Sequence, residues 1–247
     1  MISKSVIPES VHIPAGMFIY HVVHKMRVGR CPLHDHGPRL VELPAFEMDR
    51  TPVTNAAYAE FLRATGYQPR APRNFLRHWV VERGGDVERG ICPPDLADHP
   101  VVWVSPEDAE AYARWQQKRL PTDEEWQWAA QGVENRAWPW GDQFDSSRCN
   151  HDSPGTTPVD RYPQGVSPFG CLDMAGNAWE WIGPTLDVDW HRSCFIRGGS
   201  YYLPRGSFWY IEGGAQRNNH HVRIFLLNAA LNRAATVGFR CVKGDDR

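Results

Sequence analysis

The stretch Gly176-Asn177-Ala178-Trp179-Glu180-Trp181 sets two tryptophans beside a glycine, and Trp138-Pro139-Trp140-Gly141 has the same combination. The 247 residues include 11 tryptophans, 20 prolines and 21 glycines. Proline and glycine interrupt helices and strands, whereas a large ring can order an irregular segment by packing against it. The sequence therefore predicts a fold with long loops that are held in place by aromatic side chains.

Three segments carry the start and stop signals of helices. The first helix is capped by Thr54 or Asn55 and stops at Gly66. The second begins after Ser105, and the third begins after Thr122. Each segment places apolar residues at helical spacing, which predicts three helices with one buried face each.

The remainder of the chain predicts strands and loops. Val11 opens a turn that feeds a strand running to about Val28, and after Gly132 the chain becomes short extended pieces. No internal repeat or low-complexity linker separates the chain into parts. We predict an α+β fold with low regular secondary structure, as a single compact domain over residues 11–247 after a leader at residues 1–10.

Composition argues against several functional classes. A net charge of -2 supplies no basic field for nucleic acid. No apolar run reaches the ~20 residues of a membrane span, and the N-terminus lacks the apolar core of a signal peptide, so a cytoplasmic location is expected. The six cysteines are scattered without a Cys-x-x-Cys pair, which predicts free thiols in a reducing compartment.

Seven short motifs occur in the order seen in the formylglycine-generating sulfatase-modifying factors, which the chain resembles from about residue 11 to residue 243. The resemblance implies a C-type-lectin-like α+β fold with low regular secondary structure. The motifs are Pro52-Val53-Thr54-Asn55, His99-Pro100-Val101-Val102-Trp103-Val104-Ser105, Arg119-Leu120-Pro121-Thr122-Asp123-Glu124-Glu125-Trp126, Trp138-Pro139-Trp140-Gly141, Gly176-Asn177-Ala178-Trp179-Glu180-Trp181, Arg197-Gly198-Gly199-Ser200 and Gly238-Phe239-Arg240.

The resemblance implies a structural calcium site. Asp173, Gly176, Ala178 and Glu180 match family positions that bind calcium, and they offer two carboxylates and two backbone carbonyls to a cation that prefers oxygen ligands. Asn150 resembles the start of a second family site, although the loop after it is shorter here. The alternative is that the two carboxylates are solvated or accept hydrogen bonds from loop N–H groups.

The family's oxidase chemistry, as the resemblance implies it, uses two cysteines after Arg-Gly-Gly-Ser to hold copper(I). Leu203 and Phe208 stand at those positions here, and neither side chain ligates a metal. We therefore expect no formylglycine generation by that mechanism. Ser200 is either a nucleophile or a backbone-binding residue at the groove floor, and the residues expected to line the groove are Trp179, Tyr201, Leu203, Phe208 and Arg217. If the segment is extended, Trp179 and Trp181 are expected to alternate between its two faces, so that one lies in the core and the other could line the groove, with the core favoured for both.

Histidines offer a replacement for the lost thiols. His220 and His221 lie in a segment that is longer than its family counterpart, and they face opposite sides if it is a strand. With Ser200 they are the candidate catalytic residues. His34 and His36 are candidate ligands for iron or another redox metal. The ergothioneine-type sulfoxide synthases of the superfamily are iron enzymes, but the resemblance supplies no ligands for this chain.

Two functions remain open on these observations. One is a metal-dependent oxidase or oxygenase, with non-heme iron or another metal not held by cysteine, that acts on a small molecule or a peptide. The other is a non-catalytic ligand- or protein-binding module of the C-type-lectin-like kind, because the stretch from Tyr201 to Val237 is rich in side chains that form contact surfaces. We expect a monomer or a small homo-oligomer, with no nucleic-acid or membrane partner.

Overall fold

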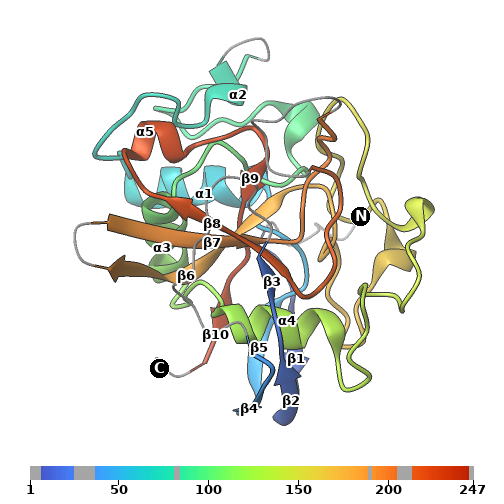
Figure 1. The fold of residues 1–247 in the computed structure, drawn as a ribbon. Coiled ribbons are helices and arrows are strands. Elements are labelled where there is room, and N and C mark those ends of the chain that lie inside the picture. The colour runs from blue at the N-terminus through green and yellow to red at the C-terminus, as the bar shows by residue number, and fades with distance from the viewer. Residues whose placement is uncertain (1–6, 25–36, 81–83, 189–190, 205–212, 245–247) are drawn as a thin grey trace.

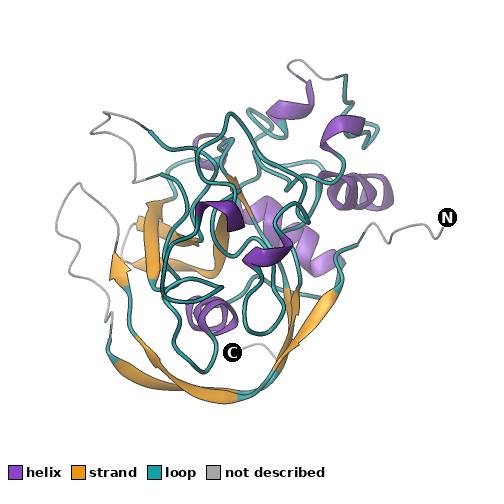
Figure 2. Cartoon of the chain, turned by 90° about the vertical axis from the view of Figure 1, so that its right-hand side faces the viewer, coloured by secondary structure: helices purple, strands orange, loops and turns teal. Residues whose placement is uncertain are grey.

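The computed structural model describes residues 7–24, 37–80, 84–188, 191–204 and 213–244. These residues form one α+β domain (Figure 1). Much of the chain between the helices and strands is loop, as Figure 2 shows, in line with the predicted low content of regular structure. The helices are α1 (Asn55–Thr65), α2 (Arg77–Val80), α3 (Pro106–Trp115), α4 (Asp123–Gln131) and α5 (Ala229–Asn232), with short 3-10 turns at Pro94–Leu96, Ser146–Arg148 and Pro163–Gly165.

The three predicted helices are α1, α3 and α4, and their caps are confirmed. The Thr54 hydroxyl accepts a hydrogen bond from the N–H of Ala57, and Gly66 ends α1 in the left-handed conformation with φ 63°. Ser105 and Thr122 each form a capping box at the start of α3 and α4. These local hydrogen bonds explain why the helix boundaries follow from the sequence.

Two small sheets hold the N-terminal part of the chain. β1 (Ser10–Ile13) and β10 (Val242–Lys243) pair with opposite edges of β5 (Phe46–Asp49), and β2 (Gly16–Tyr20) pairs with β4 (Arg39–Leu43). The prediction of one strand up to about Val28 is wrong, because the chain forms separate pieces. Pro14, which has no N–H for a ladder, lies between the first two. Residues 25–28 lie outside the described residues.

A five-stranded sheet forms the centre of the domain, with strand order β3-β8-β7-β6-β9. Its strands are β3 (Val23–His24), β6 (Trp179–Val188), β7 (His191–Arg197), β8 (His220–Phe225) and β9 (Val237–Gly238). The expectation of only short extended pieces after Gly132 is wrong here, since β6 spans 10 residues and β7 spans 7. The pairing of β3 with β8 joins the N-terminal segment to the C-terminal one.

Aromatic side chains fill two cores. One core includes Tyr58, Trp79 and Trp181, all at most 1% exposed, where α1 and α3 pack together and α3 contacts β6 (Figure 1). The other contains Trp126 and Trp128 of α4, packed against β2 and β5. The prediction that rings order this loop-rich chain is confirmed. No helix within the described residues has both the length and the apolar character needed to cross a membrane.

The cysteines of the described residues are free thiols, as predicted, while Cys31 lies outside them. Burial raises the pKa of Cys149 and of Cys194 to about 12, and that of Cys171 to about 11. Because the thiolate is the reactive form, these three side chains behave as small apolar residues near neutral pH.

Candidate functional site

The loop Arg197–Ser200 holds together two segments that are distant in sequence, one at Gly176 and one at Gly214–Gln216. The carbonyl of Gly198 accepts hydrogen bonds from the N–H of Gly176 at 2.8 Å and from that of Gln216 at 3.0 Å. Gly199 has φ 86°, and a Cβ at this position would meet the carbonyl oxygen of Gly214 at 2.2 Å. Only glycine fits this close approach of two backbones. The two glycines of the motif therefore build the floor on which Ser200 lies.

A pocket of about 250 Å³ lies beside Ser200. Trp179 and Trp181 both line it, so the expectation that they face opposite sides of the strand is wrong. Residues two apart on a strand share a face. The other described residues that line the pocket are Ile196, Tyr202, Gly213, Ile224, Leu231, Asn232, Ala234, Thr236 and Val237. None of these described residues is a histidine, cysteine or acid, so they give the pocket an apolar wall and no common metal ligand.

The other residues predicted to line the groove do not line the pocket beside Ser200 within the described part of the chain. Tyr202, rather than Tyr201, lines the pocket, and the side chain of Leu203 is packed near Gly214 while 38% exposed. Arg217 lines a different cavity. Phe208 lies outside the described residues. The Ser200 hydroxyl accepts a hydrogen bond from the N–H of Tyr202 at 3.3 Å, which matches the expected backbone-binding role.

The two candidate histidines of β8 face opposite sides of the sheet, as the strand geometry predicts. His221 is 1% exposed, and its ring stacks on Phe195 with centroids 4.2 Å apart. The ring of His24 meets it edge-on at 5.3 Å. His220 donates from Nδ1 to Oε1 of Gln216 at 3.1 Å. Neither histidine lines the pocket beside Ser200, and His34 and His36 lie outside the described residues.

His221 belongs to a buried network around Asp123, a residue that sequence reasoning did not single out. The Asp123 carboxylate accepts hydrogen bonds from Nε and Nη2 of Arg197 at 2.5 and 2.6 Å, from the Tyr20 hydroxyl at 2.5 Å and from Nδ1 of His221 at 3.0 Å. Although burial opposes ionisation, the guanidinium and the imidazole hold the pKa of Asp123 below its usual range. Asp123 directly follows the helix cap Thr122, and an acid in the first turn of a helix is favoured by the helix dipole. Its presence in the sequence therefore gave no sign of a further role.

The chain matches the sulfatase-modifying factor enzyme 1-like domain over residues 2–244. It belongs to this family. It is 33% identical to the formylglycine-generating enzyme of Thermomonospora curvata over 85% of this chain and 86% of that protein. It is 31% identical to hercynine oxygenase of Mycolicibacterium smegmatis over 84% of this chain, but it spans only 56% of that protein. The structure of PvdO from Pseudomonas aeruginosa matches with a TM-score of 0.66 at 23% identity, covering 97% of this chain and 95% of that one.

The family match confirms the predicted fold, a formylglycine-generating-enzyme-like α+β domain. The same family contains proteins named for different activities. Membership therefore identifies the scaffold but does not by itself identify the activity of this chain.

Three residues predicted to bind calcium, Asp173, Gly176 and Asn150, lie in loops that are joined by hydrogen bonds. The Asn177 side chain donates to Asp173 Oδ2 at 2.8 Å, and its carbonyl oxygen accepts from Nδ2 of Asn150 at 3.1 Å. Gly176 donates its N–H to the Arg197–Ser200 loop. Asp173 is 6% exposed, and burial raises its pKa to about 7. A buried carboxyl that resists ionisation is the kind of group that a bound cation would stabilise as its anion.

Glu180, the other acid predicted for calcium, has different partners. Its Oε1 and Oε2 accept hydrogen bonds from Nη2 and Nε of Arg240, both at 2.7 Å, and Oε2 also accepts from the Trp126 ring at 2.8 Å. Both residues of the ion pair are fully buried. Glu180 is therefore paired with Arg240, and Asp173 is the one remaining carboxylate of the predicted calcium set. In the part of the chain that the structure describes, no group of three or more His, Cys, Asp or Glu is placed to hold a metal.

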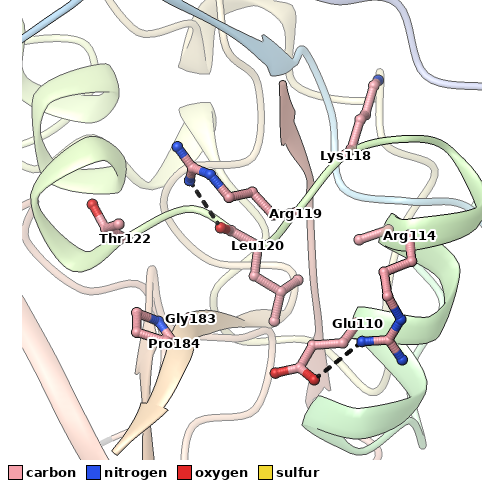
Figure 3. A pocket seen from close by; sticks show the side chains of 9 residues that line it. Glu110, Arg114, Lys118, Arg119, Leu120, Thr122, Gly183 and Pro184 are labelled. Carbon is pink, nitrogen blue, oxygen red and sulfur yellow. Dashed lines mark hydrogen bonds and ion pairs between the residues drawn. The ribbon is translucent and has the colours of Figure 1, made fainter. Parts of the chain in front are cut away.

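A separate cavity of about 270 Å³ lies between α3 and the start of α4 (Figure 3). Its charged groups have partners, because Glu110 pairs with Arg114 at 3.6 Å and Arg119 pairs with Glu125 at 2.7 Å. None of the residues predicted for the functional site lines it. Paired charges at this junction of helices favour a structural role.

Proposed function

We propose that the chain binds an apolar side chain of a peptide, or a small molecule of similar size, in the pocket beside Ser200. The observation that carries the proposal is the largely apolar lining of this pocket, to which Trp179 and Trp181 both contribute from the core. Large rings supply much apolar contact area at a small cost in side-chain entropy.

The size and lining of the pocket limit its occupant. A volume of about 250 Å³ is below the ~300–1,000 Å³ of typical small-molecule sites, so one side chain or a small ring fits. Ser200, Asn232 and Thr236 add polar groups that can orient the backbone or a substituent of such a ligand. The position of the pocket next to the Arg197–Ser200 loop agrees with a groove-binding role.

The test uses two exposed leucines as a matched pair. Leu231 lines the pocket and is 71% exposed, whereas Leu227 is 77% exposed and does not line it. We expect N-acetyl-phenylalaninamide and N-acetyl-leucinamide to bind, as measured by saturation-transfer NMR. Leu231→Asp should weaken this binding by about tenfold or more, because it places a charge against an apolar ligand, and Leu227→Asp should not. Absence of saturable binding, or equal loss in both variants, would refute the proposal.

A second candidate is a metal-dependent oxidase or oxygenase, with iron or another metal not held by cysteine, acting on a small molecule or peptide. Two observations favour it: the similarity to hercynine oxygenase, and the pairing of β3 with β8, which sets His24 beside His221. His34 and His36 follow β3 in the sequence, and they are the proposed ligands of the metal.

Metal content tests this second candidate independently of ligand binding. The protein is expressed with iron and copper available, purified and analysed by mass spectrometry for metals. We expect about one equivalent of metal, lost in His34→Ala and His36→Ala and kept in Leu231→Asp. Substoichiometric metal in the wild type, or unchanged content in the histidine variants, would contradict the oxygenase and leave the binding proposal standing.

A further inference from the structure

A polar cavity of about 280 Å³ lies between the end of α4 and the segment before β8. Two glutamines of α4, Gln127 and Gln131, line it and are each 1% exposed. Arg136, Arg217 and His21 contribute further nitrogen-bearing side chains. No aspartate or glutamate is among the described residues that line it, so this cavity differs from the apolar pocket beside Ser200.

One of the lining side chains, Gln131, carries a buried amide N–H group. Arg197 can only donate, so its hydrogen bond at 3.2 Å fixes the oxygen of Gln127 toward it. The Nε2 of Gln127 then donates to Oε1 of Gln131 at 3.0 Å, which leaves Nε2 of Gln131 as a donor. Among the described residues this buried nitrogen has no hydrogen-bond partner. Leaving such a donor without a partner is unfavourable, and an oxygen atom that reaches this nitrogen from the cavity would relieve the penalty.

The rim supplies positive charge. Arg217 is exposed and has no ion pair with any described residue, whereas Arg136 pairs with the exposed Glu134 at 2.7 Å. A guanidinium presents parallel N–H groups that match two oxygens of a carboxylate or phosphate. A cation would find no counter-charge on the described walls, and an apolar ligand would leave the amide unsatisfied.

We propose that this cavity is a second binding site, which takes a small anion bearing a carboxylate or phosphate group. Arg217 contacts the anion from the rim, and Gln131 donates to it from the buried side. The proposal does not depend on what occupies the pocket beside Ser200, since the described linings of the two cavities share no residue.

Isothermal titration at low salt with inorganic phosphate, and separately with succinate, tests the site and distinguishes the two anion classes. We expect at least one probe to bind at a single site and to be weakened by added salt, because the rim is exposed. Arg217→Gln should weaken binding about tenfold or more, as loss of a charge-assisted hydrogen bond does. Arg89→Gln is the matched control, since the Arg89 side chain is 79% exposed and lies outside the cavity.

Two further variants separate the parts of the proposal. Gln131→Leu removes the buried donor and should also weaken anion binding, while Leu231→Asp in the apolar pocket should not change it. Arg217 is exposed, so Arg217→Gln is expected to fold and to decide the question even if Gln131→Leu does not. Failure of both probes to saturate, or equal affinities of Arg217→Gln and Arg89→Gln, would overturn the inference.

Discussion

Asp173 should make the stability of this protein fall as the pH rises. Burial raises the pKa of its carboxyl from the ordinary value of 3.8 to about 7. Between these two values the folded state keeps a proton that the unfolded state has released. The stabilisation that depends on this proton is complete below the unfolded pKa and is lost as the pH rises through about 7.

The substitution Asp173→Asn removes the titration and keeps the contact with the side chain of Asn177, because an amide oxygen can accept the same hydrogen bond. Each pH unit within the window corresponds to about 1.4 kcal/mol. The variant should therefore gain about 3 kcal/mol relative to the wild type between about pH 5 and about pH 8. For a domain of this size that corresponds to roughly 6–12 °C in Tm.

The assay is urea unfolding of both proteins across this pH range, with chelator and with added calcium. If calcium uses Asp173, calcium should stabilise the wild type more strongly at about pH 8 than at about pH 5, and Asp173→Asn should not respond. A free-energy difference between the two proteins that is independent of pH would refute the reasoning about burial. A wild-type response that is the same with chelator and with calcium would refute the calcium site alone.

Four other substitutions test the buried scaffold by chemical unfolding. Glu180→Gln and Arg240→Met should each lower the free energy of unfolding by about 3–5 kcal/mol, because each leaves one buried charge without its partner. The double variant removes both charges, so its cost should be smaller than the sum of the two single costs. Additive costs would contradict the ion pair. Asp123→Asn should also cost about 3–5 kcal/mol near neutral pH, since it leaves the fully buried Arg197 without a counter-charge, and an unchanged midpoint would contradict this. Gly199→Ala should cost more than about 3 kcal/mol, and wild-type stability would show that the contact with Gly214 relaxes.

The features predicted well from sequence are those fixed by local chemistry. A hydroxyl at Ser105 or Thr122 and an acid three residues later satisfy each other within one turn, so the helix start needs no information from elsewhere. The opposite facing of His220 and His221 is equally local, because it follows from the strand period alone. The same rule, applied to Trp179 and Trp181, should have placed them on one face.

The partners of buried charges depend instead on contacts between distant segments. Glu180 meets Arg240 from 60 positions away, and Asp123 meets Arg197 from 74 positions away. A carboxylate at either position suits a cation site and an ion pair equally well, so residue type alone could not separate calcium from a guanidinium. Whether such a carboxylate binds a cation or pairs with an arginine depends on which segment the fold places next to it.

This division also explains how the chain can keep the family fold while residues at the groove differ. Arg197, Glu180 and Arg240 lie in the motifs that carry the resemblance, and the structure uses all three in buried ion pairs. Leu203 follows the same loop but is 38% exposed, where a substitution disturbs little packing. A change of chemistry at the groove is therefore compatible with an intact scaffold. Because family membership identifies the scaffold alone, the proposed functions rest on the pocket beside Ser200 and on the polar cavity at Gln131 and Arg217 rather than on the shared motifs.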